Sequence, residues 1–206
     1  MTVYAVGITG GSGAPYALRL LQVLVAAGHE VHVVVTPAGE TVLQIESGIK
    51  PGKTLREKEA VLTGAIEASG SGRLRLFEPT NLAAPISSGS FPCAGMVIVP
   101  CSTGTLGRVA NGISSNLIER AADVMLKERR RLVVVPRETP LNEIHLRNML
   151  LLRQAGADML PAMPAFYHKP RTIADMVDMI VGRILDRLGV ENALFHRWGM
   201  EREDED

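Results

Sequence analysis

Two short β-branched runs near the start of the chain, separated by a helix-length segment, most constrain how it can fold. Val3 to Ile8 is almost wholly apolar and ends in a glycine-rich loop, and Val31 to Val35 repeats the apolar pattern. Between them, apolar residues recur at helical spacing from Pro15, and Gly28 is placed to end that helix. Strands without polar alternation are typical of a parallel sheet covered on both faces. The segment therefore predicts a β-α-β unit.

The same alternation continues along the chain and predicts one α/β domain over residues 1–206. Further strands are expected at 74–77, 96–99, 132–135 and around Met159, and further helices at 38–45, 117–128, 141–154 and 173–188. The weakly patterned stretch 49–73 is expected to hold a surface helix and loops, and the acidic ending 200–206 to be a mobile tail. The predicted fold is a single doubly wound parallel sheet, Rossmann-like or flavodoxin-like, with helices on both faces.

Charge and cysteine usage argue against several classes of protein. Lysine plus arginine (22) balance aspartate plus glutamate (22), so no net field favours nucleic acid or a membrane. The longest charge-free stretch, 79–107, is broken by proline and glycine and is not expected to span a bilayer. Cys93 and Cys101 match no zinc spacing and the five histidines show no ligand pattern, so no metal is predicted. Reduced thiols, and a start without a basic signal-peptide region, favour the cytoplasm.

Ligands of open α/β sheets lie beyond the carboxyl ends of the strands, and four such ends carry unusual loops here. These loops are 9–13, 100–105, 136–140 and 161–167. The first places Gly10, Gly11 and Ser12 before a helix N-terminus, where bare amides suit a phosphate or a flavin edge, although the glycines alone would permit a tight turn. A nicotinamide dinucleotide is disfavoured because the loop is not G-x-G-x-x-G and Thr36 replaces the ribose-binding carboxylate.

Two of these positions keep a purely structural alternative. Thr36 either contacts a mononucleotide such as FMN or caps the helix 38–45. The hydroxyl-rich loop Ser102-Thr103-Gly104-Thr105 suits a phosphate, but it would also suit a helix cap.

Several charged residues are candidates for handling an anion. Arg120 and Lys127 lie seven residues apart on one predicted helix, and Arg183 interrupts the apolar stripe of the last helix. Arg137 ends a strand and precedes Glu138, which two prolines flank. For each cation, a solvated surface position is the common alternative. Glu138 is the best acid–base candidate, and capping the following helix is its alternative role.

Taken in order, the motifs resemble those of the UbiX/Pad1 family of flavin prenyltransferases. The matching segments are 7–14, 88–90, 100–106, 116–123, 127–130, 136–140, 166–168 and 197–199. The resemblance covers nearly the whole chain except residues 49–72, and Gly11 stands where many members carry alanine.

The resemblance implies two neighbouring ligand sites. FMN contacts are implied for Gly10, Gly11, Ser12, Thr36, Ser102, Thr103, Gly104, Thr105 and Arg137. A dimethylallyl phosphate site is implied for Arg120, Lys127, Glu138, Tyr167 and Arg183, together with the segment Ser88-Gly89-Ser90. Trp198 would close over the isoprenoid.

The activity implied is transfer of a dimethylallyl group to N5 and C6 of reduced FMN, without a metal. Ser12 and Glu138 would move protons, Lys127 would meet the leaving phosphate and Trp198 would face the allyl cation. The product, prenylated FMN, would serve a UbiD-type decarboxylase. Members assemble as homo-oligomers, often dodecamers, with sites at subunit contacts. The sequence leaves open the pathway served and the choice between a monophosphate and a diphosphate donor.

Two other functions remain as alternatives. An FMN-dependent cysteine-type decarboxylase is disfavoured because the loop 100–105 lacks asparagine and no histidine lies between His32 and His145. A non-catalytic FMN carrier is compatible with the same residues.

Overall fold

A computed structural model describes residues 1–199, and the acidic ending 200–206, predicted to be mobile, lies outside the described residues. The strands are β1 (Val3–Ile8), β2 (Glu30–Val35), β3 (Arg73–Phe77), β4 (Gly95–Cys101), β5 (Arg131–Pro136) and β6 (Asp158–Met159). The helices are α1 (Ala14–Ala26), α2 (Pro37–Ser47), α3 (Leu55–Ile66), α4 (Thr103–Ala110), α5 (Leu117–Lys127), α6 (Glu143–Ala155) and α7 (Ile173–Leu188), with a 3₁₀ turn at Pro85–Ser87.

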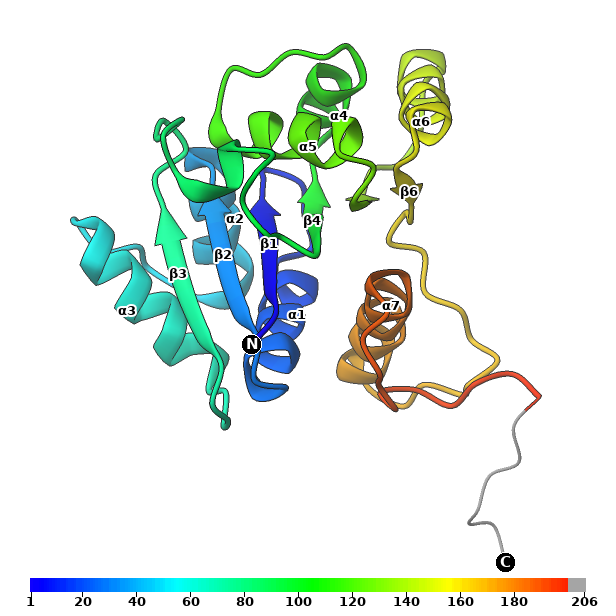
Figure 1. The fold of residues 1–206 in the computed structure, drawn as a ribbon. Coiled ribbons are helices and arrows are strands. Elements are labelled where there is room, and N and C mark those ends of the chain that lie inside the picture. The colour runs from blue at the N-terminus through cyan, green and yellow to red at the C-terminus, as the bar shows by residue number, and fades with distance from the viewer. Residues whose placement is uncertain (200–206) are drawn as a thin grey trace, which may run out of the picture.

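The strands form one parallel sheet in the order β3-β2-β1-β4-β5-β6 (Figure 1). β1 pairs with β2 from Val3↔Glu30 to Ile8↔Val35 and pairs with β4 on its other side. The chain moves outward in one direction through β2 and β3 and in the other through β4, β5 and β6. The strand order therefore reverses between β1 and β4, which is where open sheets of this kind bind ligands. The predicted doubly wound fold is confirmed.

Helices cover both faces of the sheet and build two separate cores. Leu20, Leu24 and Val181 belong to a buried cluster that joins α1, α3 and α7 to one face. Ile118 and Met125 belong to a second cluster that joins α4 and α5 to the other. Successive strand residues point to opposite faces, so each buried strand contributes to both cores. As a result, α5 and α7 lie on opposite sides of the sheet.

Two local details differ from the sequence prediction, and a third agrees with it. The helix α4 begins at Thr103, so the expectation of a loop through Thr105 was wrong. The helix α6 begins at Glu143, two residues later than expected, because Asn142 caps it by accepting a hydrogen bond from the His145 amide (2.9 Å). The surface helix expected within 49–73 is α3, and Thr54 and Glu57 form a capping box at its start. Within residues 1–199, no helix is both long and apolar enough to cross a lipid bilayer.

Candidate functional site

The glycine-rich loop after β1 lies beside the hydroxyl-rich segment after β4. Thr9 connects them, because its buried hydroxyl donates to the carbonyl of Pro100 (2.7 Å) and accepts from the amide of Ser102 (2.8 Å). Two strand ends that are far apart in sequence are thereby held together at the point where the strand order reverses. The sequence predicted both segments as parts of one site, and the structure brings them together.

The start of α2 packs against the loop after β1 and leaves no room for a side chain at Gly10. A side chain at Gly10 would place its Cβ 2.7 Å from the Cβ of Ala38, so glycine is needed there for packing as well as for access. Gly13 has φ 129°, a backbone conformation that favours glycine, and it is the N-cap of α1. The loop is therefore fixed in place, and Gly10 and Gly11 put no side chain of their own over its backbone.

A carboxylate that the sequence analysis did not single out lies at the start of α1. One oxygen of Glu46, from the last turn of α2, accepts the amides of Gly13 (2.9 Å) and Ala14 (2.8 Å). Burial by itself would raise the pKa of this carboxyl. Hydrogen bonds from the Ser12 side chain and the two amides outweigh burial, and the net pKa lies below its usual value. Sequence reasoning missed Glu46 because the predicted helix stopped at residue 45 and nothing local links it to the loop.

Arg137 reaches the same loop from the far side. Its Nε donates to the carbonyl of Ser12 (3.2 Å), and its positive charge also helps to lower the pKa of Glu46. Ser12, Glu46 and Arg137 therefore gather from three elements at the carboxyl edge of the sheet. Of these, Ser12 and Arg137 were predicted from the sequence.

Thr36 and Ser102, two of the candidates at this edge, each cap a helix. The Thr36 hydroxyl accepts the amide of Gly39 (3.1 Å) at the start of α2. The Ser102 hydroxyl accepts the amide of Thr105 (3.3 Å) and donates to the Thr105 hydroxyl (3.1 Å) at the start of α4. The capping role is thus observed for both, and the starts of α1, α2 and α4 all lie at the carboxyl edge. Helix N-termini grouped in this way favour an anion.

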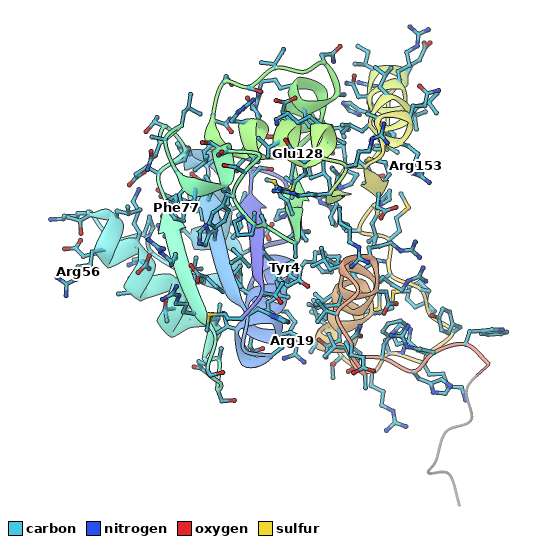
Figure 2. All side chains as sticks on the ribbon, in the orientation of Figure 1. Tyr4, Arg19, Arg56, Phe77, Glu128 and Arg153 are labelled. Atoms are coloured by element: carbon cyan, nitrogen blue, oxygen red, sulfur yellow. The ribbon has the colours of Figure 1, made fainter. Side chains whose placement is uncertain are left out.

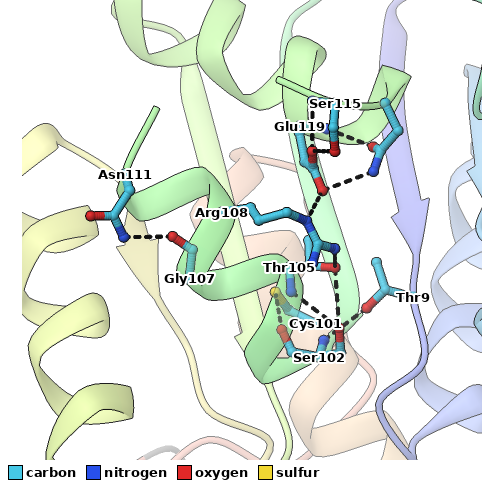
Figure 3. Close-up of polar contacts among 10 residues, drawn as sticks. Thr9, Cys101, Ser102, Thr105, Gly107, Arg108, Asn111, Ser115 and Glu119 are labelled. Atoms are coloured by element: carbon cyan, nitrogen blue, oxygen red, sulfur yellow. Dashed lines mark hydrogen bonds and ion pairs between the residues drawn. The ribbon is translucent and has the colours of Figure 1, made fainter. Parts of the chain in front are cut away.

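A buried carboxylate fixes α4 to α5 behind this edge (Figure 3). Glu119 is 1 % exposed, and it accepts the amide (2.8 Å) and hydroxyl (2.5 Å) of Ser115 and pairs with Nε of Arg108. Arg108 also reaches the Thr105 hydroxyl (3.4 Å). Burial raises the pKa of Glu119, but the Ser115 and Arg108 contacts outweigh it and the net pKa is lowered. The first turn of α4 is therefore held from both sides.

Glu138 lies in an open pocket of about 420 Å³ between β5 and the start of α6. The pocket is lined by Pro136, Arg137, Glu138, Thr139, Leu141, Met149, Pro161, Ala162 and Met163. One carboxylate oxygen of Glu138 accepts the amide of Thr139 (3.1 Å), and the rest of the side chain is exposed. Asn142 caps α6, so the alternative of Glu138 as its cap is wrong.

The segment Ser88-Gly89-Ser90 lies along α5, as a shared site with Arg120 and Lys127 requires. The two serine hydroxyls are 2.9 Å apart, and Nε of Arg120 donates to the carbonyl of Ser87 (3.2 Å). A Cβ at Gly89 would lie 2.7 Å from Nζ of Lys127. Lys127 ends α5, next to Glu128 (labelled in Figure 2), and β5 begins shortly after it. This group therefore extends toward the amino edge of the sheet, away from the loop after β1.

The remaining three candidates, Arg183, Tyr167 and Trp198, come from α7 and from the segments on either side of it. Arg183 belongs to α7, and the rings of Tyr167 and Trp198 meet edge to face, 5.6 Å apart at 90°. Because α5 and α7 cover opposite faces of the sheet, one chain does not bring Arg183 together with Arg120 and Lys127. The expected gathering of the three cations is not found within a single chain.

The fold and the loops at the switch point define a flavin-binding α/β protein, and the family described as Flavoprotein matches residues 3–185. The flavin prenyltransferase UbiX of Halalkalibacterium halodurans is 50% identical over 202 residues, which are 98% of this chain and 96% of that protein. The chain belongs to the UbiX family of flavin prenyltransferases.

Two solved structures are similar over almost their whole length. AnUbiX (PadA1), in complex with FMN and dimethylallyl pyrophosphate, has a TM-score of 0.86 and 40% identity, with 98% of this chain and 99% of that chain covered. A dodecameric FMN-dependent Ubix-like decarboxylase from Escherichia coli O157:H7 has a TM-score of 0.81 and 41% identity, with 97% and 100% covered.

Proposed function

We propose that this protein transfers a dimethylallyl group from dimethylallyl phosphate to N5 and C6 of reduced FMN. The observation that carries the proposal is the full-length similarity to a structure that holds FMN together with a dimethylallyl donor. The supporting geometry is the pair of loops that Thr9 joins at the switch point of the sheet.

The residues at the carboxyl edge fit FMN. The glycine backbone of the loop after β1 and the N-termini of α2 and α4 would hold the phosphate and the flavin edge, and the Arg137 guanidinium would add a positive charge. The residues assigned to FMN are Gly10, Gly11, Ser12, Thr36, Ser102, Thr103, Gly104, Thr105 and Arg137. When bound in its reduced form, the flavin supplies the nucleophilic atoms.

The charged residues fit an allylic phosphate. Lys127, Arg120 and Arg183 would balance the negative charge that grows on the leaving phosphate, with Ser88, Gly89 and Ser90 beside the first two. Tyr167 and Trp198 would offer aromatic faces to the cationic allyl fragment and exclude water. Ser12 and Glu138 would carry the proton released on ring closure. The geometry adds Glu46, whose ionised carboxylate is bonded to the loop that bears Ser12.

Such a site needs more than one copy of the chain. Arg183 and the Arg120–Lys127 pair lie on opposite faces of the sheet, so they can meet around one donor only if neighbouring subunits contribute them. We therefore propose a homo-oligomer, and a dodecamer like the Escherichia coli relative is the expected form. A UbiD-type decarboxylase as the recipient of the product, and a cytoplasmic location, are further proposals.

The test is an anaerobic incubation of the protein with reduced FMN and dimethylallyl phosphate, followed by the mass of the released flavin. A gain of one C5H8 unit supports the transfer. Unchanged FMN that stays bound to the protein would instead identify a carrier. A separate incubation of the FMN-loaded protein with a peptide ending in cysteine tests the cysteine-type enzyme, which would release carbon dioxide from that peptide.

A further inference from the structure

The segment that follows α7 folds back onto that helix. The side-chain amide of Asn192 donates to the carbonyl of Gly182 (3.3 Å) and to Asp186 Oδ1 (3.1 Å). The ring of Phe195 lies against the bare backbone of Gly182, where a Cβ would come within 2.6 Å of it. Two contacts therefore fasten residues 190–196 to α7 before the chain reaches Trp198.

A bidentate ion pair fastens the same segment a third time. Nη1 of Arg197 is bonded to Asp186 Oδ2 (2.8 Å) and Nη2 to Asp186 Oδ1 (2.7 Å), and the guanidinium also lies over the ring of Phe195 (5.2 Å). Two parallel bonds fix the direction of a guanidinium as well as its position. Trp198 is the next residue and is 81 % exposed, so its position depends on this anchored backbone and on the edge of Tyr167.

The same carboxylate also faces Arg183, one turn earlier on α7. Arginine and aspartate three residues apart on a helix are well placed to pair. Here Nε of Arg183 makes only a long ion pair with Asp186 Oδ2 (3.9 Å), whereas Arg197 is bonded to both oxygens of the same carboxylate (2.8 and 2.7 Å). The Arg183 side chain is 44% exposed, so its guanidinium can also be reached by an anion from solvent.

We propose that Arg197 is a positioning residue for prenyl transfer: by binding both oxygens of Asp186, it holds Trp198 against Tyr167 and keeps Asp186 from pairing closely with Arg183. This inference rests on the proposed function, in which Arg183 binds the phosphate of the donor. Arg197 and Asp186 themselves need not touch the donor or the flavin.

The experiment compares Arg197→Met, Asp186→Asn and the double variant, with Arg187→Met as the matched control on an exposed position of the same helix. In Arg197→Met, Asp186 pairs with Arg183, and we expect the KM for dimethylallyl phosphate to rise about fivefold while FMN affinity stays unchanged. Adding Asp186→Asn should restore most of that KM, because the competing carboxylate is gone. A merely structural role predicts no such recovery.

Trp198 gives an independent readout because the chain has a single tryptophan. Loss of the clamp in Arg197→Met, Asp186→Asn and the double variant should lower the time-resolved fluorescence anisotropy of Trp198, while Arg187→Met should match the wild type. An unchanged anisotropy in Arg197→Met, or a double variant no better than Arg197→Met in KM, would overturn the proposal.

Failure of the proposed function is distinguishable from failure of this inference. A wild-type protein that forms no prenylated flavin contradicts the proposed function. Anisotropy, and the calorimetric affinity for dimethylallyl phosphate, need no turnover and still decide the role of Arg197.

Discussion

Glu46 and Ser12 illustrate how much of this site depends on single side chains. The carboxylate of Glu46 is bonded to backbone amides at the positive end of α1, and its pKa is lowered there. A carboxyl whose pKa is lowered on folding stabilises the fold above its unfolded pKa, and that contribution is lost as the pH falls. We therefore expect the loop to lose stability when acid protonates the Glu46 carboxylate.

Glu46→Gln should test this link. The amide side chain can still accept the two hydrogen bonds, but the negative charge is gone. Because Glu46 is largely exposed, screening limits the effect, and we expect a loss of about 0.5 kcal/mol in unfolding free energy at neutral pH. Denaturant unfolding at a series of pH values should show the two proteins converging below about pH 4. A difference that stays constant with pH would remove the charge from the explanation.

Glu138 is a second single residue that can be tested, and its expected role is proton transfer and not stability. Its exposed carboxylate lines the pocket beside Arg137 and contributes little to the fold. Glu138→Gln should therefore keep FMN affinity and melting temperature while slowing formation of prenylated flavin by about a hundredfold. Single-turnover mass analysis of the flavin gives the rate. Normal turnover would exclude Glu138 from the proton transfer.

At the scale of elements, the pairing of α4 with α5 depends on one buried charge. Glu119 connects Arg108 on α4 to Ser115 and Asn116 at the start of α5. Removing one member of a buried ionic network leaves the others without a partner, which costs more than the network contributes when intact. The first turn of α4, where Ser102 and Thr105 are expected to meet FMN, is the part most affected.

Glu119→Gln is expected to lower the unfolding free energy by about 3 kcal/mol at neutral pH. The lowered pKa of Glu119 means that the wild type should lose this advantage as the pH falls below the ordinary carboxyl range. Thermal denaturation at pH 7 and at a series of pH values falling below the ordinary carboxyl pKa of 4.5 would measure both effects, and FMN affinity at pH 7 should fall in parallel. Arg147→Gln, which breaks an exposed pair with Glu143, is the matched control and should change stability little.

For the whole molecule, the separation of the cations across the sheet decides how a complete site can form. Lys127 extends toward the amino edge beside Gly89, whereas Arg183 lies on the opposite face with α7. A donor phosphate that needs both must lie between subunits. Subunit mixing tests this requirement directly.

Lys127→Met and Arg183→Met subunits should each be almost inactive alone. The two variants are denatured together in equal amounts and refolded jointly. A site built from two subunits is intact when the chain that supplies Lys127 is the Arg183→Met variant and the chain that supplies Arg183 is the Lys127→Met variant. Each condition holds for about half of the chains, so about a quarter of wild-type activity should return. Refolded wild type gives the reference value. A mixture that stays inactive would show that both cations act from the same chain.

The sequence by itself determined the order of the strands and of every helix except α4, the single parallel sheet and the loops that face its carboxyl edge. These follow from apolar periodicity and from glycine, serine and threonine at strand ends, which are local properties. It also indicated Ser12, Arg137 and the neighbourhood of Ser88 with Arg120 and Lys127.

Only the tertiary structure decided which residues meet across elements. The bond of Glu46 to the first turn of α1, the clamp between Asp186 and Arg197, and the placement of Arg183 away from Arg120 join or separate positions that no local pattern relates. The physical reason is that each helix turns its apolar face toward one of the two cores beside the sheet. This packing fixes the direction in which every other residue of the helix points.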